Sequence, residues 1–216
     1  MTANVDDGAA YPDPATLGGA PARGRELRAQ GKRTMQRLLD AGLAVFAARG
    51  YHSTRVDDIV REARTSHGTF YLYFANKEDL LRALAGACVE DLEALAASVG
   101  RLGPGPDGEA ALGAFLGRFL AVYRRYGPVI RAWTEGQVGD AEVDRLGVAA
   151  FTAIGAALAG HLDGAIEHPD VAVMALMAMI ERFSFVVAAS RVPAPDDVVL
   201  ATLTRVVQRG FFAPEA

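Results

Sequence analysis

The sequence predicts an all-α protein built from two domains. Of its 216 residues 51% are hydrophobic, and in most segments they recur at helical spacing, whereas no segment alternates strictly between apolar and polar residues as a half-buried strand does. Stretches rich in Gly and Pro, such as 100–108 and 193–195, separate the periodic segments. A chain of this length and apolar content can bury one large core or two smaller ones.

The chain is expected to begin with a flexible arm over residues 1–27. Residues 1–20 carry three Asp, no Lys or Arg, and many Gly, Pro and Ala, and they lack the apolar segment of a signal peptide. The arm then becomes basic through Arg23 and Arg25. A first helix is expected from about Arg28 to Arg49, because its apolar residues form one stripe.

Residues 54–80 predict two short helices joined by a tight turn, with a third helix directly behind. Thr54 and Asp57 have capping-box spacing, so the first helix is expected to start at Thr54. Ser66 and Asn76 are expected to cap the second and third helices. Phe70 and Phe74, one turn apart, can bury together; the side chains then left to face outward are His67, Thr69, Tyr71 and Tyr73.

This segment resembles the DNA-binding domain of the TetR family of transcriptional regulators. The matching residues are Phe46, Gly50, Tyr51, Thr54, Ile59, Ala63, Ser66, Gly68, Thr69, Phe70, Tyr71, Tyr73, Phe74, Lys77, Glu78 and Leu80. The family usually places Gly-Val between the two helices, whereas this chain has Arg64-Thr65. Because Gly relieves a backbone position that needs positive φ, Arg64 implies strain or a slightly different turn.

The resemblance implies a sequence-specific regulator of transcription that binds double-stranded operator DNA, most simply a repressor released by a small-molecule effector. The motif covers 54–74, within a DNA-binding domain over 28–81. Phosphate contacts are expected from Thr54, Tyr71, Tyr73 and Lys77, and base contacts from Thr65, Ser66, His67, Gly68 and Thr69. From Pro21 to Leu80 there are 11 Arg and Lys against 7 Asp and Glu, a net charge of +4 in a chain of net charge −4.

Residues 82–216 are expected to form a helical domain for ligand binding and dimerisation. Its helices are expected at about 76–99, 109–126, 129–137, 140–167, 170–190 and 196–212, with Gly127-Pro128 breaking the chain between the second and third. In the resembled family the last two helices pair across a two-fold axis, which implies a homodimer through 170–190 and 196–212. The 170–190 segment is long enough to span a membrane, but Glu181 and Arg182 at its centre argue against this. One cysteine, Cys88, fits a cytoplasmic protein.

An effector pocket is expected where aromatic and Met side chains of this domain gather. The candidates are Phe115, Phe119, Tyr123, Trp133, Phe151, Met174 and Met177, although the same residue types fill an ordinary helical core. The sequence shows no evident basic cluster in the domain, which favours an apolar or amphipathic ligand.

Catalysis is not expected. The sequence contains no HExxH, GxSxG, P-loop or dinucleotide motif, so no cofactor and no metal site is predicted, and His161 and His168 are better explained as solvated residues near a helix end. The alternative function is an α-helical, dimeric small-molecule-binding protein that does not bind DNA. In that case, changes at Tyr71 and Lys77 would leave every activity intact.

Overall fold

The computed structural model describes residues 29–136, 138–162, 167–189 and 191–212, and all regular elements in these ranges are helical. The arm predicted over 1–27 lies outside the described residues. The elements are α1 Ala29–Arg49, α2 Val56–Glu62, α3 His67–Tyr73, α4 Lys77–Ala97, α5 Pro106–Thr134, α6 Ala141–Ala159, α7 Pro169–Ala188 and α8 Asp196–Val207, followed by a π-helical turn Gln208–Phe212. The all-α fold class is confirmed.

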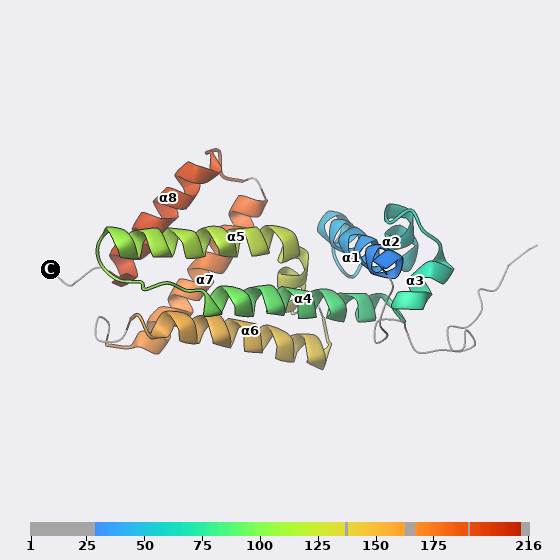
Figure 1. Ribbon diagram of the computed structural model, residues 1–216, viewed down its shortest axis with the longest axis horizontal. Coiled ribbons are helices and arrows are strands. Elements are labelled where there is room, and N and C mark those ends of the chain that lie inside the picture. Colours follow the sequence, from blue (N-terminus) through green and yellow to red (C-terminus); the bar gives the residue numbers. More distant parts are fainter. Residues whose placement is uncertain (1–28, 137, 163–166, 190, 213–216) are drawn as a thin grey trace, which may run out of the picture.

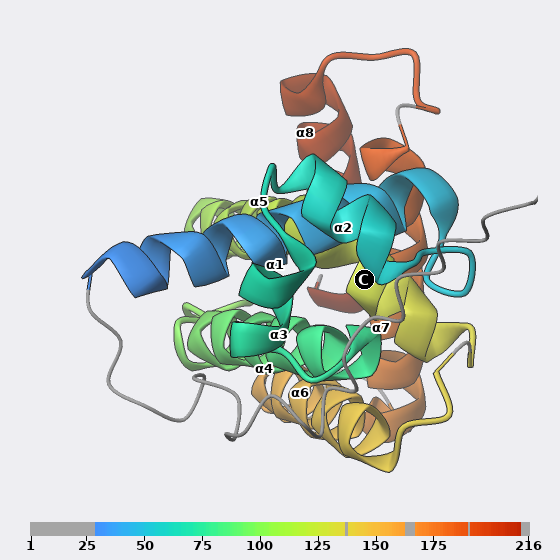
Figure 2. The same ribbon diagram turned by 90° about the vertical axis from the view of Figure 1, so that its right-hand side faces the viewer.

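The helices form a small N-terminal group and a longer helical body. Helices α1, α2 and α3 lie together at one end of the molecule, and α4 runs from this group into the body (Figure 1). In the body, α4 packs against α5 and α6, while α5 also contacts α7 and α8. The view turned by 90° places α1, α2 and α3 in front of the body (Figure 2). The recognition motif therefore lies at the far end of an elongated molecule.

Two apolar cores meet along α4. The N-terminal core contains Phe46, Ile59, Phe70 and Phe74 and is joined by Leu80 and Leu84 from the first turns of α4. The body core is built around the aromatic side chains of α5 and includes the later α4 residues Cys88, Leu92 and Leu95. One continuous helix therefore contributes to both cores.

The predicted break at Gly127-Pro128 is wrong, since α5 continues through Pro128 to Thr134. A proline inside a helix removes one backbone hydrogen bond and costs about 3 kcal/mol. Residues beyond it offset this cost by burial: Val129 and Ile130 are 3% and 4% exposed. Helix α6 begins after its predicted cap Asp140, whose carboxylate accepts hydrogen bonds from the N–H groups of Glu142 and Val143, but it ends at Ala159 rather than near 167.

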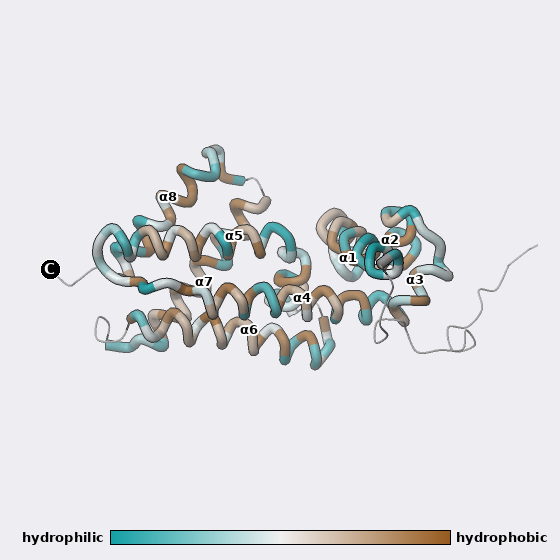
Figure 3. Tube along the Cα trace, viewed as in Figure 1, coloured by the Kyte–Doolittle hydropathy of each residue, from teal (hydrophilic) through white to brown (hydrophobic). Residues whose placement is uncertain are grey.

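Helices α7 and α8 keep apolar residues on their exposed faces. Val171 and Met174 on α7 are 59% and 72% exposed, and Val198 and Val206 on α8 are 50% and 54% exposed. Hydrophobic and hydrophilic residues alternate along α8 (Figure 3). By length and composition α7 could cross a membrane, with a mean hydropathy of 1.9 over its most apolar 18 residues, of which a third are buried. A helix of an associating bundle has the same properties.

Candidate nucleic-acid interface and ligand cavity

The turn between α2 and α3 is tight and uses a left-handed residue. Arg64 has φ of 50°, the positive value that its position in the sequence implied. The chain then turns back, and the N–H of Thr65 donates to the carbonyl of Val60 at 2.9 Å. Ser66 caps α3 as expected, its hydroxyl accepting from the N–H of Thr69 at 3.2 Å. These bonds fix the angle at which α3 leaves α2.

The first turn of α3 and the residue before it remain accessible. Ser66 and Gly68 are exposed, and Thr65, His67 and Thr69 are partly exposed. Phe70 is fully buried, so α3 is anchored on its inner side. The N-terminal half of a recognition helix is the part that meets base edges in helix-turn-helix proteins. All five residues expected to read bases thus lie together at the accessible start of α3.

Two expectations about the phosphate-binding residues are corrected. Tyr73 does not face outward: it is only 9% exposed, because Phe70, Tyr73 and Phe74 share the inner face of α3 at i, i+3 and i+4. Thr54 is not the helix cap and is 2% exposed, with its hydroxyl donating to the carbonyl of Gly50 at 2.8 Å.

The cap of α2 is instead Arg55. The N–H of Arg55 donates to the carboxylate of Asp58 at 3.2 Å, so the capping interaction lies one residue later than predicted. The guanidinium of Arg49 also donates to this carboxylate, at 3.0 Å. Asp58 thus ties the start of α2 to the end of α1.

Lys77 fastens α4 to the segment after α1. Its Nζ donates to the carbonyls of Tyr51 and Thr54 at 3.0 and 3.1 Å and lies 4.4 Å from the centre of the Tyr51 ring. An ammonium group has three N–H donors, and these two hydrogen bonds use two of them. Lys77 therefore holds the domain together and still presents a positive charge near its surface.

Two surface features of the α2–α3 unit were not foreseen from the sequence. A ring nitrogen of His67 forms a short contact with the carboxylate of Asp57 on α2, which orients the imidazole. Leu72 is 62% exposed on α3, unusually open for a leucine, and a partly exposed Tyr71 precedes it. The helical period could have flagged Leu72, because it falls outside the face shared by Phe70 and Phe74.

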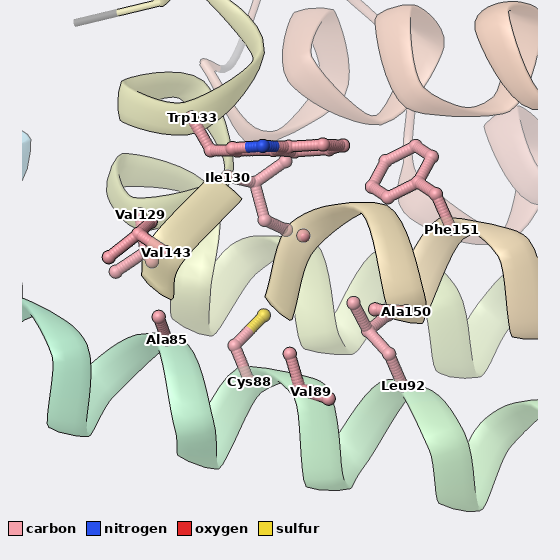
Figure 4. Close-up of a pocket in the computed structure, with 11 residues that line it drawn as sticks. Ala85, Cys88, Val89, Leu92, Val129, Ile130, Trp133, Val143, Ala150 and Phe151 are labelled. Atoms are coloured by element: carbon pink, nitrogen blue, oxygen red, sulfur yellow. The ribbon is translucent and has the colours of Figure 1, made fainter. Parts of the chain in front are cut away.

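A small apolar cavity lies in the body between α4, α5 and α6. Its volume is about 30 Å³, and its lining residues are Ala85, Cys88, Val89, Leu92, Val129, Ile130, Trp133, Val143, Gly147, Ala150 and Phe151. The close-up places Cys88 and Leu92 of α4 on one side and the rings of Trp133 and Phe151 on the other (Figure 4). Such a space holds about one water molecule. A larger ligand needs these side chains to move apart.

The comparisons with known proteins agree on the N-terminal part of the chain. Residues 38–84 match the model for bacterial regulatory proteins of the tetR family. This segment runs from α1 into α4 and contains the entire α2–turn–α3 unit. The N-terminal domain is a TetR-family domain. It is 47% identical over 47 residues to the fatty acid metabolism regulator protein of Bacillus subtilis, a match that covers 22% of this chain and 24% of that protein.

Solved structures resemble the fold of the whole chain. A tetR-family transcriptional regulator from Streptomyces coelicolor superposes with a TM-score of 0.63 at 22% identity, covering 82% of this chain and 80% of that one. FadR from Bacillus subtilis, solved in complex with stearoyl-CoA, gives 0.57 at 19% identity, covering 81% and 95%. At these identities the likeness establishes the fold. The chain spans 24%, 15% and 52% of the length of three curated relatives that it matches.

The ligand candidates fall into three places. Trp133 and Phe151 line the small cavity, and their rings lie 4.9 Å apart. Phe151 also lines an open groove of about 590 Å³ between α6 and α7, together with Met174 and Met177. Phe115, Phe119 and Tyr123 line neither space: they are 0%, 2% and 1% exposed in the body core.

The small cavity borders both cores. Val129 and Val143 pack with the N-terminal core, whereas Cys88 and Ile130 pack with the body core. An ion pair spans α4 and the start of α6 nearby: the guanidinium of Arg82 donates to the carboxylate of Asp140 at 2.8 Å. Within the described residues, no group of three or more His, Cys, Asp and Glu could hold a metal ion.

Proposed function

We propose that this chain is a sequence-specific DNA-binding transcriptional regulator that responds to a small-molecule effector. The observation that carries the proposal is the Ser66-capped α3, anchored by Phe70 and accessible along its first turn. A short helix held in this way fits the width of the major groove. The matched TetR-type segment supports the same conclusion.

In this proposal the interface divides into base-reading and phosphate-binding residues. Base edges are read by the start of α3, where hydroxyls and an imidazole can donate and accept hydrogen bonds. The residues assigned to bases are Thr65, Ser66, His67, Gly68 and Thr69. Phosphates are assigned to Tyr71 and to the free donor of Lys77, while Thr54 and Tyr73 contribute by packing. Leu72 is placed to contact a thymine methyl group.

Dimerisation is proposed to pair two such domains on one operator. The exposed apolar residues of α7 and α8 give each chain a self-complementary surface, which a two-fold axis would bury. Two recognition helices on one DNA face need half-sites about 34–36 Å apart, and a symmetric dimer can provide this spacing.

The effector is proposed to act by separating α4 from α5 and α6. Filling the space behind Trp133 would push α6 away from α4, and α4 begins inside the DNA-binding domain. A ligand that binds only the opened cavity stabilises the corresponding spacing of the two heads. Release from the operator makes the protein a repressor. The lining of the cavity favours an apolar or amphipathic molecule.

Selection of tight-binding fragments from a pool of random duplex DNA tests the proposal. The full chain should enrich a palindromic consensus with half-sites about one helical turn apart, and its affinity should fall as salt rises. Binding without any consensus, or no binding by the folded protein, would leave the alternative of a helical ligand-binding protein without a DNA function.

A further inference from the structure

Three arginines gather around one phenylalanine ring at the end of the body. The guanidinium carbons of Arg182, Arg131 and Arg191 lie 4.6, 5.5 and 5.5 Å from the centre of the Phe185 ring. They come from α7, from α5 and from the segment after α7. Arg182 and Arg191 are close in the sequence, whereas Arg131 comes from a distant helix, so the fold is needed to bring it to the same ring.

The cluster has little negative charge of its own. Throughout the described ranges, no carboxylate forms an ion pair with any of the three guanidinium groups. The neighbouring acid, Glu181, accepts a hydrogen bond of 2.9 Å from the phenol of Tyr123. The pKa of Tyr123 is raised, first by burial and then by Glu181, while Arg131 acts in the opposite direction. Glu181 and Arg131 therefore flank the same phenol and leave Arg182 and Arg191 uncompensated.

This arrangement has the properties of an anion receptor. A ring has two faces, so at least two of the three guanidinium groups share one. Each cation–π contact at an exposed site is weak, so it offsets the repulsion between like charges only in part. A carboxylate or phosphate bound between the guanidinium groups would remove the repulsion and form paired, charge-assisted hydrogen bonds.

An apolar groove leads to the cluster. The groove between α6 and α7 has a volume of about 590 Å³, within the range of small-molecule sites, and is lined mainly by apolar residues such as Ala156, Val173 and Met177. It ends at Glu181, one turn before Phe185 on α7, and at Thr134, which lies one turn after Arg131. Two carboxylates line the groove: Asp170 lies far from this end along α7, and Glu181, at this end, accepts the hydrogen bond from Tyr123.

We propose that Arg131, Arg182 and Arg191 bind the anionic head group of an amphipathic effector whose apolar chain lies in the groove between α6 and α7. The inference rests on the proposed function and deepens it, because it specifies an effector with a carboxylate or phosphate at one end. Phe151 lines both the groove and the cavity behind Trp133, so the bound chain would press on the wall between them.

Titrations of the full chain with matched ten-carbon probes test this assignment. Decanoate, decyl phosphate and 1-decanol are added below their aggregation limits, and binding is followed by the fluorescence of Trp133, the one tryptophan in the sequence. Both anions should bind at least about tenfold more tightly than the alcohol, the effect of one charge-assisted interaction. The anion that binds more tightly identifies the head group as a carboxylate or a phosphate.

A double variant and a matched control separate the head-group site from general charge. In Arg182→Gln/Arg191→Gln, the two anions should lose their preference while the alcohol binds as before. Arg101→Gln/Arg145→Gln removes two exposed arginines elsewhere and should bind like the unchanged protein. Equal binding of anions and alcohol by the unchanged protein, an undiminished preference in the first variant, or no binding of any probe would overturn the proposal.

These measurements use no DNA, so the two proposals fail separately. Anion-selective binding by a chain that enriches no DNA consensus would retain the arginine site and reject the regulator. A clear DNA consensus without anion preference would retain the regulator and reject the arginine site.

Discussion

At the scale of single residues, Arg64 adopts a strained backbone conformation in the fold. A non-glycine residue at φ of 50° costs roughly 1 kcal/mol, because its Cβ lies too close to the following carbonyl. Arg64→Gly should therefore raise the free energy of unfolding by about 0.5–1 kcal/mol, after allowing for the extra freedom of Gly in the unfolded chain.

Chemical denaturation measures this change, and Arg64→Ala is its control, since it removes the same charge without relieving the backbone. An equal gain in stability in both variants would show that the effect comes from removing the charge, and would contradict backbone strain at Arg64.

Labelling of the buried Cys88 reports on access to the small cavity that it lines. Burial, and to a smaller extent Asp91, raises the pKa of the Cys88 thiol to about 12. The thiolate is the reactive form, so at pH 8 its fraction is about a thousandfold below that of an ordinary cysteine. A thiol reagent should label the native protein very slowly at pH 8 and faster as pH rises toward 12.

An effector that opens the cavity should speed the labelling of Cys88, because its sulfur then meets solvent. Rapid labelling of the folded protein at pH 8 without any ligand would show that the cavity is not closed in solution.

At the scale of elements, Asp140 joins α6 to α4 by two separate interactions. Its carboxylate caps α6 and receives a hydrogen bond from Arg82. Burial favours the neutral acid, but the hydrogen bonds from Val143 and Arg82 outweigh it, and the pKa of Asp140 is lowered. A lowered pKa means that the carboxylate stabilises the fold above its unfolded pKa of about 4 and that this contribution is lost as pH falls further.

Asp140→Ala should therefore lower the free energy of unfolding by about 1–2 kcal/mol at pH 7, whereas Asp140→Asn keeps a capping oxygen and should cost less. Both differences should shrink below about pH 4, in urea denaturation at a series of pH values. A loss of stability that does not change with pH would show that the variants act through packing and not through the charge of Asp140.

The same elements show what the sequence could predict. Capping and short-range periodicity are local, and they placed α3 after Ser66, α4 after Asn76 and α6 after Asp140 correctly. The continuation of α5 through Pro128 could not be predicted in this way, because it depends on burial of Val129 and Ile130 against two cores.

For the candidate sites, too, local patterns predicted some features and missed those that depend on the fold. The motif placed five base-reading candidates together, but it could not show that Tyr73 and Thr54 turn inward. The cluster of Arg131, Arg182 and Arg191 needs α5 to meet the end of α7, two segments far apart in the sequence, so local patterns cannot detect it.

At the scale of the whole molecule, the apolar faces of α7 and α8 predict a dimer that point charges can disrupt. Val198→Glu and Val206→Glu would each bury a carboxylate in the proposed interface and should yield monomers in sedimentation experiments. Val148→Glu is the matched control, since Val148 is 58% exposed and lies on α6, outside the two helices of the proposed interface. Dimers that survive the α8 variants, or monomers of the Val148 variant alone, would move the interface elsewhere.

Base reading by α3 is tested most directly by comparing the DNA sites that different variants select. Binding sites are selected from random duplex DNA by the unchanged chain and by His67→Ala, with Tyr71→Phe as a phosphate-contact control. His67→Ala should lose the preference for particular bases at one symmetric pair of positions in the palindrome, whereas Tyr71→Phe should keep the consensus and bind more weakly. A consensus that is the same in all three proteins would contradict base reading by the start of α3.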